Sequence, residues 1–349
     1  MKRIALVYPV ASGGVKSVIS RLSKGLKLEG FDVDLLSLGN RMPLIVIKDL
    51  AMLKLLANYD VVLYLGSIPW PSHMFLENVG VFVHGFVRHE LLNSMKCGHL
   101  HTRLTASILL TLWNISRALN RIKFFVCHSI TTCEMNDLPL DRVAILPQFV
   151  LPDEVIAALD IQKSFKVNGK SEIRILTYTS FARSPRLLSV ESILWLVKVV
   201  AKQTNKKLKF IIVNPTTSTY QVKHFSNLTV MQIKFVPKYL FFKMILSSDL
   251  YIERCIDEEL GYSAIEAGLL GTPIAKITYS RYVSRQDYNE DIIILASTTR
   301  EFINKLIEFV NNIEYYKEYY SKKIRDFIVT KRVWDAVKHN FIKRLRHAE

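Results

Sequence analysis

Apolar runs of strand length alternate with segments of helical period along most of this chain, and this alternation limits the fold more than any other feature. Residues 4–8 and 33–36 have the length and apolar character of buried strands. Between them, Gly30 ends a helix whose apolar stripe consists of Val15, Val18, Ile19, Leu22 and Leu26. A helical crossover between two strands makes them parallel. The sequence therefore predicts an α/β fold built on doubly wound parallel sheets.

The same alternation occurs twice. In the first half, strands are expected at residues 61–65, 79–83, 124–127 and 143–146; after the polar residues 162–171, they are expected at 173–178, 209–213, 230–235, 249–253 and 273–277. A chain of 349 residues exceeds the roughly 100–200 residues of one domain. We therefore expect two Rossmann-like domains facing a cleft (residues 1–155 and 172–329), a linker (156–171), and a C-terminal helix (330–349) that crosses back to the first domain.

The net charge of +16 favours anionic partners, but it does not distinguish nucleotide phosphates, nucleic acid and acidic lipid. The four cysteines form no Cys-x-x-Cys pair, and a large hydrophobic chain needs no disulfides, so we expect reduced thiols in a cytoplasmic protein. The charge-free apolar residues 104–116 are fewer than the ~20 that cross a bilayer. Neither a membrane-spanning helix nor a signal peptide is predicted.

The segment from Glu258 to Glu266 carries the most chemical information. It leaves the strand expected at residues 249–253 and turns through Gly261 into a helix. The start of a helix presents backbone N–H groups and the positive end of the helix dipole, which suit a diphosphate. Glu258 lies in the loop and Glu266 about one turn into the helix, so the two carboxylates can accept hydrogen bonds from two sugars joined by a diphosphate.

This segment resembles the E-x7-E motif of retaining GT-B glycosyltransferases, in particular family 4 (glycosyl transferases group 1). The early Gly13-Gly14, residues 126–146 and the helix of Trp334 are also similar to that family in order and spacing. The resemblance implies that Glu266 binds ribose hydroxyls and Glu258 the transferred sugar. It further implies that Gly261 lets the backbone approach the phosphates, with Tyr262 and Ser263 beside the donor.

The resemblance also assigns residues outside the motif. Gly13 and Gly14 would line the cleft, although a tight strand-to-helix turn also favours glycine. His84 would contact the transferred sugar or merely cap its strand. Val236 and Lys238 would adjoin the base of the nucleotide.

Two positions depart from the family pattern. The family's glycine-arginine and lysine, which neutralise the leaving diphosphate, are replaced by a looser pair, Arg183 and Arg186, which could also be solvated loop residues. Glu259 stands where the family has a small residue. A second carboxylate beside a diphosphate is unfavourable unless it points away or pairs, for example with Arg254.

The acceptor side is basic, because no carboxylate occurs between Glu90 and Glu134. A helix there has one apolar stripe, expected to dock on the sheet, that consists of Leu104, Ile108, Leu112, Ile115, Leu119 and Ile122. Its opposite face carries Arg103, Arg117 and Arg121. An alternative hypothesis is that this basic face, with Trp70, Met95 and Trp113, meets an anionic bilayer or a lipid-linked acceptor.

The sequence thus predicts a retaining, metal-independent hexosyltransferase that moves sugar from a nucleotide-sugar to a glycan or lipid-linked acceptor. No metal is expected, because the chain has no Asp-x-Asp pair and His99 and His101 lack credible partners. No cofactor is expected beyond the nucleotide-sugar co-substrate. Peripheral attachment to the inner face of the cell membrane is an extension of the cytoplasmic prediction. Two alternatives stay open: a catalytically silent GT-B binding or scaffold subunit, and a basic nucleic-acid-binding protein.

Overall fold

The computed structural model describes residues 1–8, 14–39, 42–65, 75–83, 91–92, 95–96, 100–118, 121–164, 172–179, 187–214, 220–234, 236–279, 282 and 285–347. Contacts divide the chain into two compact units. Unit 1 comprises Met1–Pro147 and Val337–Glu349, and unit 2 comprises Gln148–Ala336.

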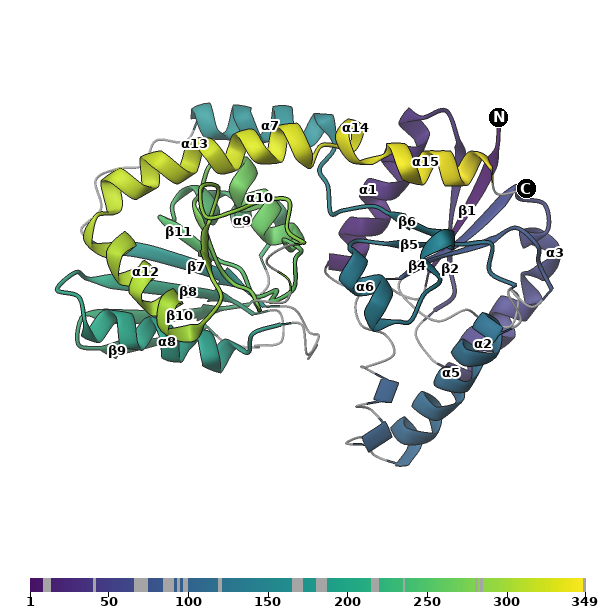
Figure 1. Cartoon of the computed structure of the whole chain (residues 1–349), viewed down its shortest axis with the longest axis horizontal. Coiled ribbons are helices and arrows are strands. Elements are labelled where there is room, and N and C mark those ends of the chain that lie inside the picture. The colour runs from purple at the N-terminus through teal and green to yellow at the C-terminus, as the bar shows by residue number, and fades with distance from the viewer. Residues whose placement is uncertain are drawn as a thin grey trace. The chain divides into compact units, whose positions relative to one another are not determined.

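Unit 1 contains a parallel sheet. Its described strands are β1 (Arg3–Tyr8), β2 (Asp32–Ser37), β3 (Val61–Leu65), β4 (Val79–Val83), β5 (Phe124–Cys127) and β6 (Val143–Ile145). They are ordered β2-β1-β3-β4-β5-β6, and every neighbouring pair is parallel. The helices are α1 (Gly14–Leu28), α2 (Met42–Ala51), α3 (Leu53–Leu56), α5 (Leu100–Ala118), α6 (Ile130–Met135) and α15 (His339–Arg346) (Figure 1). The predicted doubly wound architecture of the first half is confirmed.

Helix α1 buries the apolar stripe that its sequence predicts, since Val18, Ile19, Leu22 and Leu26 are all at most 4% exposed. The helix is amphipathic because apolar residues recur three or four positions apart and lysines fill the other face.

Helix α5 contradicts its predicted stripe. Leu104, Ile108 and Ile115 are exposed, at 58%, 59% and 42%, whereas Leu109 and Trp113 are buried. The indole of Trp113 packs edge-on against Phe125 of β5, with ring centroids 6.2 Å apart. An aromatic side chain buries more apolar area than an aliphatic one, so the face of α5 that carries Trp113 packs on the sheet in place of the predicted aliphatic stripe. The hypothesis that Trp113 meets a bilayer is therefore wrong.

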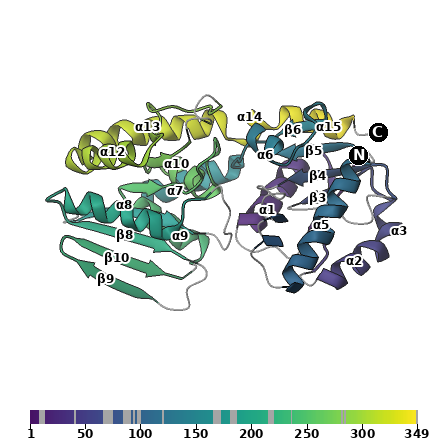
Figure 2. The same ribbon diagram turned by 60° about the horizontal axis from the view of Figure 1, so that its bottom comes forward.

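Unit 2 repeats the architecture with an added hairpin. Its described strands are β7 (Ile173–Tyr178), β8 (Leu208–Val213), β9 (Gln221–Phe225), β10 (Leu228–Ile233), β11 (Leu250–Ile252), β12 (Ile274–Ile277) and β13 (Ile294–Ala296). They are ordered β13-β12-β11-β7-β8-β10-β9, and Figure 2 shows β9 at the edge. Strand β9 is antiparallel to β10 and was not predicted. Ser226, in the turn that joins them, has a positive φ of 48°.

The helices of unit 2 surround this sheet. They are α7 (Pro152–Ser164), α8 (Val190–Lys202), α9 (Lys238–Leu246), α10 (Tyr262–Leu269), α12 (Thr299–Asn311), α13 (Ile313–Lys331) and, reaching the boundary with unit 1, α14 (Trp334–Val337). Helix α7 occupies much of the segment assigned to a linker, and Glu154 in its first turn accepts a hydrogen bond from the Leu151 N–H at 3.0 Å. A carboxylate at that position stabilises a helix start.

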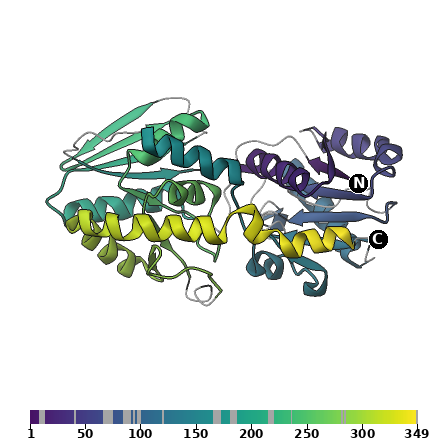
Figure 3. The same ribbon diagram turned by 90° about the horizontal axis from the view of Figure 1, so that it is seen from above.

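The C-terminal segment belongs partly to each unit. Helix α13 packs on α10 within unit 2, while α15 packs by β6 within unit 1 (Figure 3). Two contacts fasten the end of the chain to unit 1: the Lys338 ammonium lies 2.6 Å from the Glu29 carboxylate, and Lys2 donates to the Arg346 carbonyl at 2.9 Å. The two ends of the chain therefore lie side by side in unit 1.

Replacing Trp334 with alanine should lower the free energy of unfolding by about 3–5 kcal/mol, as large-to-small core substitutions do. The side chain is fully buried against Phe149, with ring centroids 4.9 Å apart. Urea unfolding checks this value. The control is Trp195→Ala, because Trp195 is 54% exposed; its expected change is about 0.5 kcal/mol. Equal losses in the two variants would contradict the packing described.

Candidate functional site

The loop between β11 and α10 contains many buried ionisable residues. Five of its ionisable residues are at most 8% exposed: Glu253, Arg254, Asp257, Glu258 and Glu259. Burying ionisable groups costs free energy unless they are hydrogen-bonded, paired or neutralised. The loop is therefore a specifically organised structure and not a simple connection.

The carboxylate of Glu253 joins the two ends of this loop. Its Oε1 accepts from the backbone N–H groups of Arg254 at 2.5 Å and Cys255 at 2.8 Å, and its Oε2 accepts from the Gly261 N–H at 2.9 Å. Hydrogen bonds to an ionised acceptor are the stronger kind. Glu253 thus determines where the loop begins and where α10 starts, a role that sequence reasoning missed.

Gly261 is glycine because of that carboxylate. A Cβ atom at this position would lie only 2.9 Å from Oε2 and 3.3 Å from Oε1 of Glu253. Its N–H group donates to Glu253, so the close approach seen here is to a protein carboxylate. Tyr262 and Ser263, the first two residues of α10, follow directly.

Three side chains on or after β12 hold the carbonyl groups of the loop. The Tyr288 hydroxyl donates to the Glu258 carbonyl at 2.8 Å, and Thr278 Oγ1 donates to the Asp257 carbonyl at 2.8 Å. The Lys276 ammonium, on a fully buried side chain, donates to the Glu259 carbonyl. A lysine inside an apolar strand is the sequence signal from which this role could have been predicted.

Its burial favours the neutral, protonated form of Glu259. Burial raises the pKa of its carboxyl group to about 8, although the positive charge of Arg332 acts in the opposite direction. The expected Arg254 partner is engaged elsewhere, since its Nε donates to the Leu188 carbonyl at 2.8 Å. A protonated carboxyl group adds no negative charge beside a diphosphate.

Glu266 and Lys238 come together from two helices. The Lys238 ammonium, at the start of α9, lies 3.5 Å from Glu266 Oε1 and 2.6 Å from Glu154 Oε1. Tyr178, the last residue of β7, lies close enough that Glu266 adds to the effect of burial in raising the tyrosine's pKa. Val236, partly buried, packs on the adjoining core. These residues all lie near the carboxyl edge of the parallel strands, where doubly wound sheets bind ligands.

Several predicted residues lie outside the part of the chain that the structure describes: Gly13, Trp70, His84, Arg183 and Arg186. Gly14 is the first residue of α1 and Arg117 lies in α5. Arg103 and Arg121 are exposed, and the Arg103 Nη2 donates to the Lys96 carbonyl at 3.1 Å.

The described residues contain no group of three or more histidine, cysteine or acidic side chains placed to hold a metal ion. None of their helices is both long enough and apolar enough to span a membrane.

Replacing Glu259 with glutamine should stabilise the protein in a pH-dependent way. Between about pH 4.5 and 8 the unfolded chain has released the Glu259 proton while the folded chain keeps it, so the wild-type free energy of unfolding falls as pH rises through this window. The variant should be more stable at pH 8 by a few kcal/mol, at about 1.4 kcal/mol per pKa unit. At pH 4.5 the two should be nearly equal.

Urea unfolding at pH 4.5, 6 and 8 measures this difference. The control is Glu318→Gln, an exposed position on α13 that should show no comparable trend. A difference between Glu259→Gln and wild type that is constant with pH would contradict the neutral state of Glu259.

Solved structures resemble the whole chain, although no family model matches it and no curated protein matches its sequence. Sucrose-phosphate synthase of Thermosynechococcus elongatus superposes with a TM-score of 0.66 at 12% identity, covering 99% of this chain and 98% of that one. WaaG, a glycosyltransferase of lipopolysaccharide biosynthesis, superposes with a TM-score of 0.63 at 12% identity, and 98% of each chain is covered. Anabaena HepE, in complex with UDP and glucose, superposes with a TM-score of 0.63 at 9% identity, covering 99% of this chain and 100% of that one. At such identities the likeness shows the fold, and the chain has the two-domain GT-B fold that its sequence predicts.

Proposed function

We propose that this protein is a retaining, metal-independent glycosyltransferase that uses a nucleotide-sugar donor. One observation carries the proposal: Glu266, about one turn into α10, lies with Lys238 and Tyr178 at the carboxyl edge of the unit 2 sheet. This arrangement occurs in a fold shared with HepE, which binds UDP and glucose. A carboxylate in such a place accepts hydrogen bonds from two neighbouring hydroxyl groups, as a ribose presents.

The donor would lie along the start of α10. Glu266 would bind the ribose, Val236 and Lys238 would adjoin the base, and Glu258 would bind the transferred sugar. The Glu258 side chain is largely buried and the Tyr288 hydroxyl holds its backbone carbonyl, so the backbone that carries this carboxylate is fixed before a sugar arrives. Preorganisation of this kind favours binding, because less freedom is lost when the ligand docks.

The leaving diphosphate would be stabilised without a metal. The positive end of the α10 dipole at Tyr262 and Ser263 supplies part of the required charge. Burial favours the neutral form of Glu259, which limits its repulsion of the diphosphate. We assign the remaining positive charge to Arg183 and Arg186, and we assign Gly13, Gly14 and His84 to the sugar side of the donor. The acceptor would attack from the face that the nucleotide leaves, which retains the anomeric configuration.

The acceptor would be a glycan or a lipid-linked sugar at an anionic membrane surface. Leu104, Ile108 and Ile115 expose apolar area along α5, a helix without a single carboxylate. Basic residues accompany them, including Arg103, Arg117 and Arg121. Apolar side chains flanked by cations suit the boundary between lipid headgroups and acyl chains.

Replacing Glu266 with alanine should weaken donor binding at least tenfold, because a charge-assisted hydrogen bond to a sugar hydroxyl is lost. A thermal-shift titration with UDP-glucose and other nucleotide-sugars measures the affinity, since a bound donor stabilises the folded state. The matched control is Glu318→Ala, which removes an exposed carboxylate of α13. Equal affinities in the two variants would overturn the donor assignment. Donor binding without hydrolysis or transfer in the wild type would favour the catalytically silent alternative.

Replacing Leu104 and Ile108 together with asparagine should reduce membrane binding about tenfold or more, because burial of one such side chain contributes about 1.5–3 kcal/mol. Flotation with vesicles of phosphatidylcholine, with and without phosphatidylglycerol, measures the bound fraction. Leu28→Asn is the control, since Leu28 is 65% exposed on another helix. Binding that is indifferent to lipid charge, or equally reduced in the control, would contradict the assignment.

A further inference from the structure

Unit 2 contains a cavity of about 740 Å³ between the C-terminal half of α8 and the hairpin of β9 and β10. Helix α8 contributes Trp195, Lys198 and Lys202 to its lining, and the hairpin contributes its turn and Leu228, the first residue of β10. Because β10 begins here, the cavity lies at the amino edge of the parallel strands. Glu266 lies at the opposite, carboxyl edge, so this cavity is separate from the candidate donor site.

Trp195 gives the cavity an aromatic surface that solvent reaches. This side chain is 54% exposed on α8. Phe225 of the hairpin also lines the cavity, but the Lys198 ammonium lies over its ring, 4.1 Å from the ring centroid. The indole of Trp195 is therefore the ring on which the nonpolar face of a ligand can pack.

The surroundings of the cavity are basic. Residues 192–248 contain nine lysines and no aspartate or glutamate. Lys202 lines the cavity, is exposed, and forms no ion pair with any residue that the structure describes. At the same edge of the sheet, Glu172 lies 3.4 Å from both Arg174 and Lys209 and is neutralised by them. The positive potential at the cavity favours a ligand with an anionic group.

Hydrogen-bonding side chains complete the lining, and they are Thr204, Asn205, Ser226 and Asn227. Thr204 is only 6% exposed, and its hydroxyl forms no hydrogen bond with any described residue. Most buried polar groups in proteins are hydrogen-bonded, so this hydroxyl indicates a partner that is not part of the chain. Hydroxyl and amide groups beside an aromatic ring suit the hydroxyl groups of a sugar.

Asn227 fixes the wall of the cavity. Its Nδ2 donates to the carbonyls of Ala201 at 2.8 Å, Thr204 at 2.9 Å and Lys206 at 3.0 Å. These bonds join the hairpin to the end of α8 and to the turn that follows it. The cavity is thus formed before a ligand arrives, which lowers the entropy that binding costs.

We infer that this cavity binds one sugar residue that bears a carboxylate or phosphate group. The C–H face of the sugar would pack on Trp195, the anionic group would lie by Lys202, and a sugar hydroxyl would pair with Thr204. A single-stranded nucleic acid fits less well, because it stacks successive bases on several aromatic side chains. The inference goes beyond the proposed function, since the ligand is neither the donor nor held at the donor site.

Calorimetric titration with four probes tests the inference. Two are anionic sugars: a tetrasaccharide of alternating N-acetylglucosamine and glucuronic acid, and glucose 6-phosphate. The others are neutral maltotetraose and a ten-nucleotide single-stranded DNA of thymidine. We expect one or both anionic sugars to bind the wild type, and maltotetraose to bind at least tenfold more weakly. The preferred anionic sugar identifies the source as an acidic glycan or a free sugar phosphate.

Three substitutions should weaken binding of the anionic sugar. Trp195→Ala should lower the affinity at least tenfold, because it removes the stacking surface. Lys202→Ala should lower it several-fold, and added salt should have a similar effect on the wild type, because this lysine is exposed. Thr204→Val should lower it several-fold without loss of stability in urea, because the hydroxyl has no described hydrogen bond to lose.

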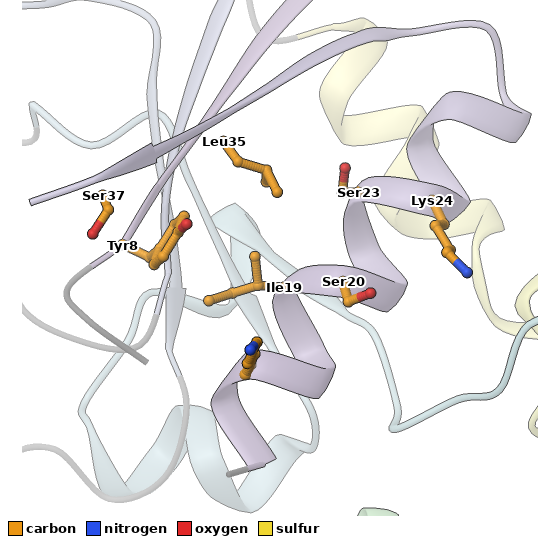
Figure 4. A pocket seen from close by; sticks show the side chains of 8 residues that line it. Tyr8, Ile19, Ser20, Ser23, Lys24, Leu35 and Ser37 are labelled. Carbon is orange, nitrogen blue, oxygen red and sulfur yellow. The ribbon is translucent and has the colours of Figure 1, made fainter. Parts of the chain in front are cut away.

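Two variants of unit 1 are the matched controls. Lys16→Ala removes an exposed lysine that lines a different cavity, between α1 and β2 (Figure 4). Phe75→Ala removes an aromatic side chain that is 70% exposed. Failure of both anionic sugars to bind, equal affinities in Trp195→Ala and Phe75→Ala, or equally tight binding of maltotetraose would overturn the inference. Binding of the DNA that is tighter than that of either sugar and depends on Trp195 would also overturn it.

UDP-glucose affinity, measured on the same proteins, separates this inference from the proposed function. Trp195→Ala should keep wild-type affinity for the donor, and Glu266→Ala should keep wild-type affinity for the anionic sugar, because the two sites lie at opposite edges of the sheet. Loss of both affinities in Trp195→Ala would overturn the separate site. If the anionic sugar binds through Trp195 but no nucleotide-sugar binds, the inference stands and only the proposed function fails.

Discussion

The three hydrogen bonds of the Glu253 carboxylate are the interaction on which the candidate donor site depends. A carboxylate only 4% exposed is tolerated because it accepts from backbone N–H groups at both ends of the loop. These bonds set the path of the residues that carry Glu258 and Glu259, and they set the first turn of α10. The position of Glu266 on that helix follows from them. The carboxylate that organises the site is thus a different one from the two that the motif singles out.

The neighbouring charges are arranged around the same loop. Lys276 contacts a backbone carbonyl and forms no described ion pair, so its charge stabilises the chain path directly. Burial raises the pKa of Glu259 and so favours its protonated form, which limits the negative charge inside the loop. The loop therefore contains four acidic residues between positions 253 and 259 with a limited negative charge. This balance explains how the chain accommodates Glu259, the residue that departs most from the family pattern.

Local pattern was enough to predict most of the fold, because buried parallel strands and the α1 stripe are visible in the sequence itself. The assignment of Glu266 and Lys238 to one donor came from the family resemblance, and the structure places their charged groups 3.5 Å apart. Three features required tertiary information. The orientation of α5 depends on the contact of Trp113 with Phe125. The hydrogen bond of Glu253 depends on Gly261, eight positions away, and the role of Lys276 depends on a carbonyl group in the loop before α10. None of these partners is fixed by periodicity.

The return of Val337–Glu349 to unit 1 makes unit 2 an insertion within the sequence of unit 1. Unit 2 is one continuous stretch, so a single segment of the sequence supplies its whole core. Unit 1 needs two segments that lie far apart in the sequence, because α15 and the contacts with Glu29 and Asp141 come after unit 2.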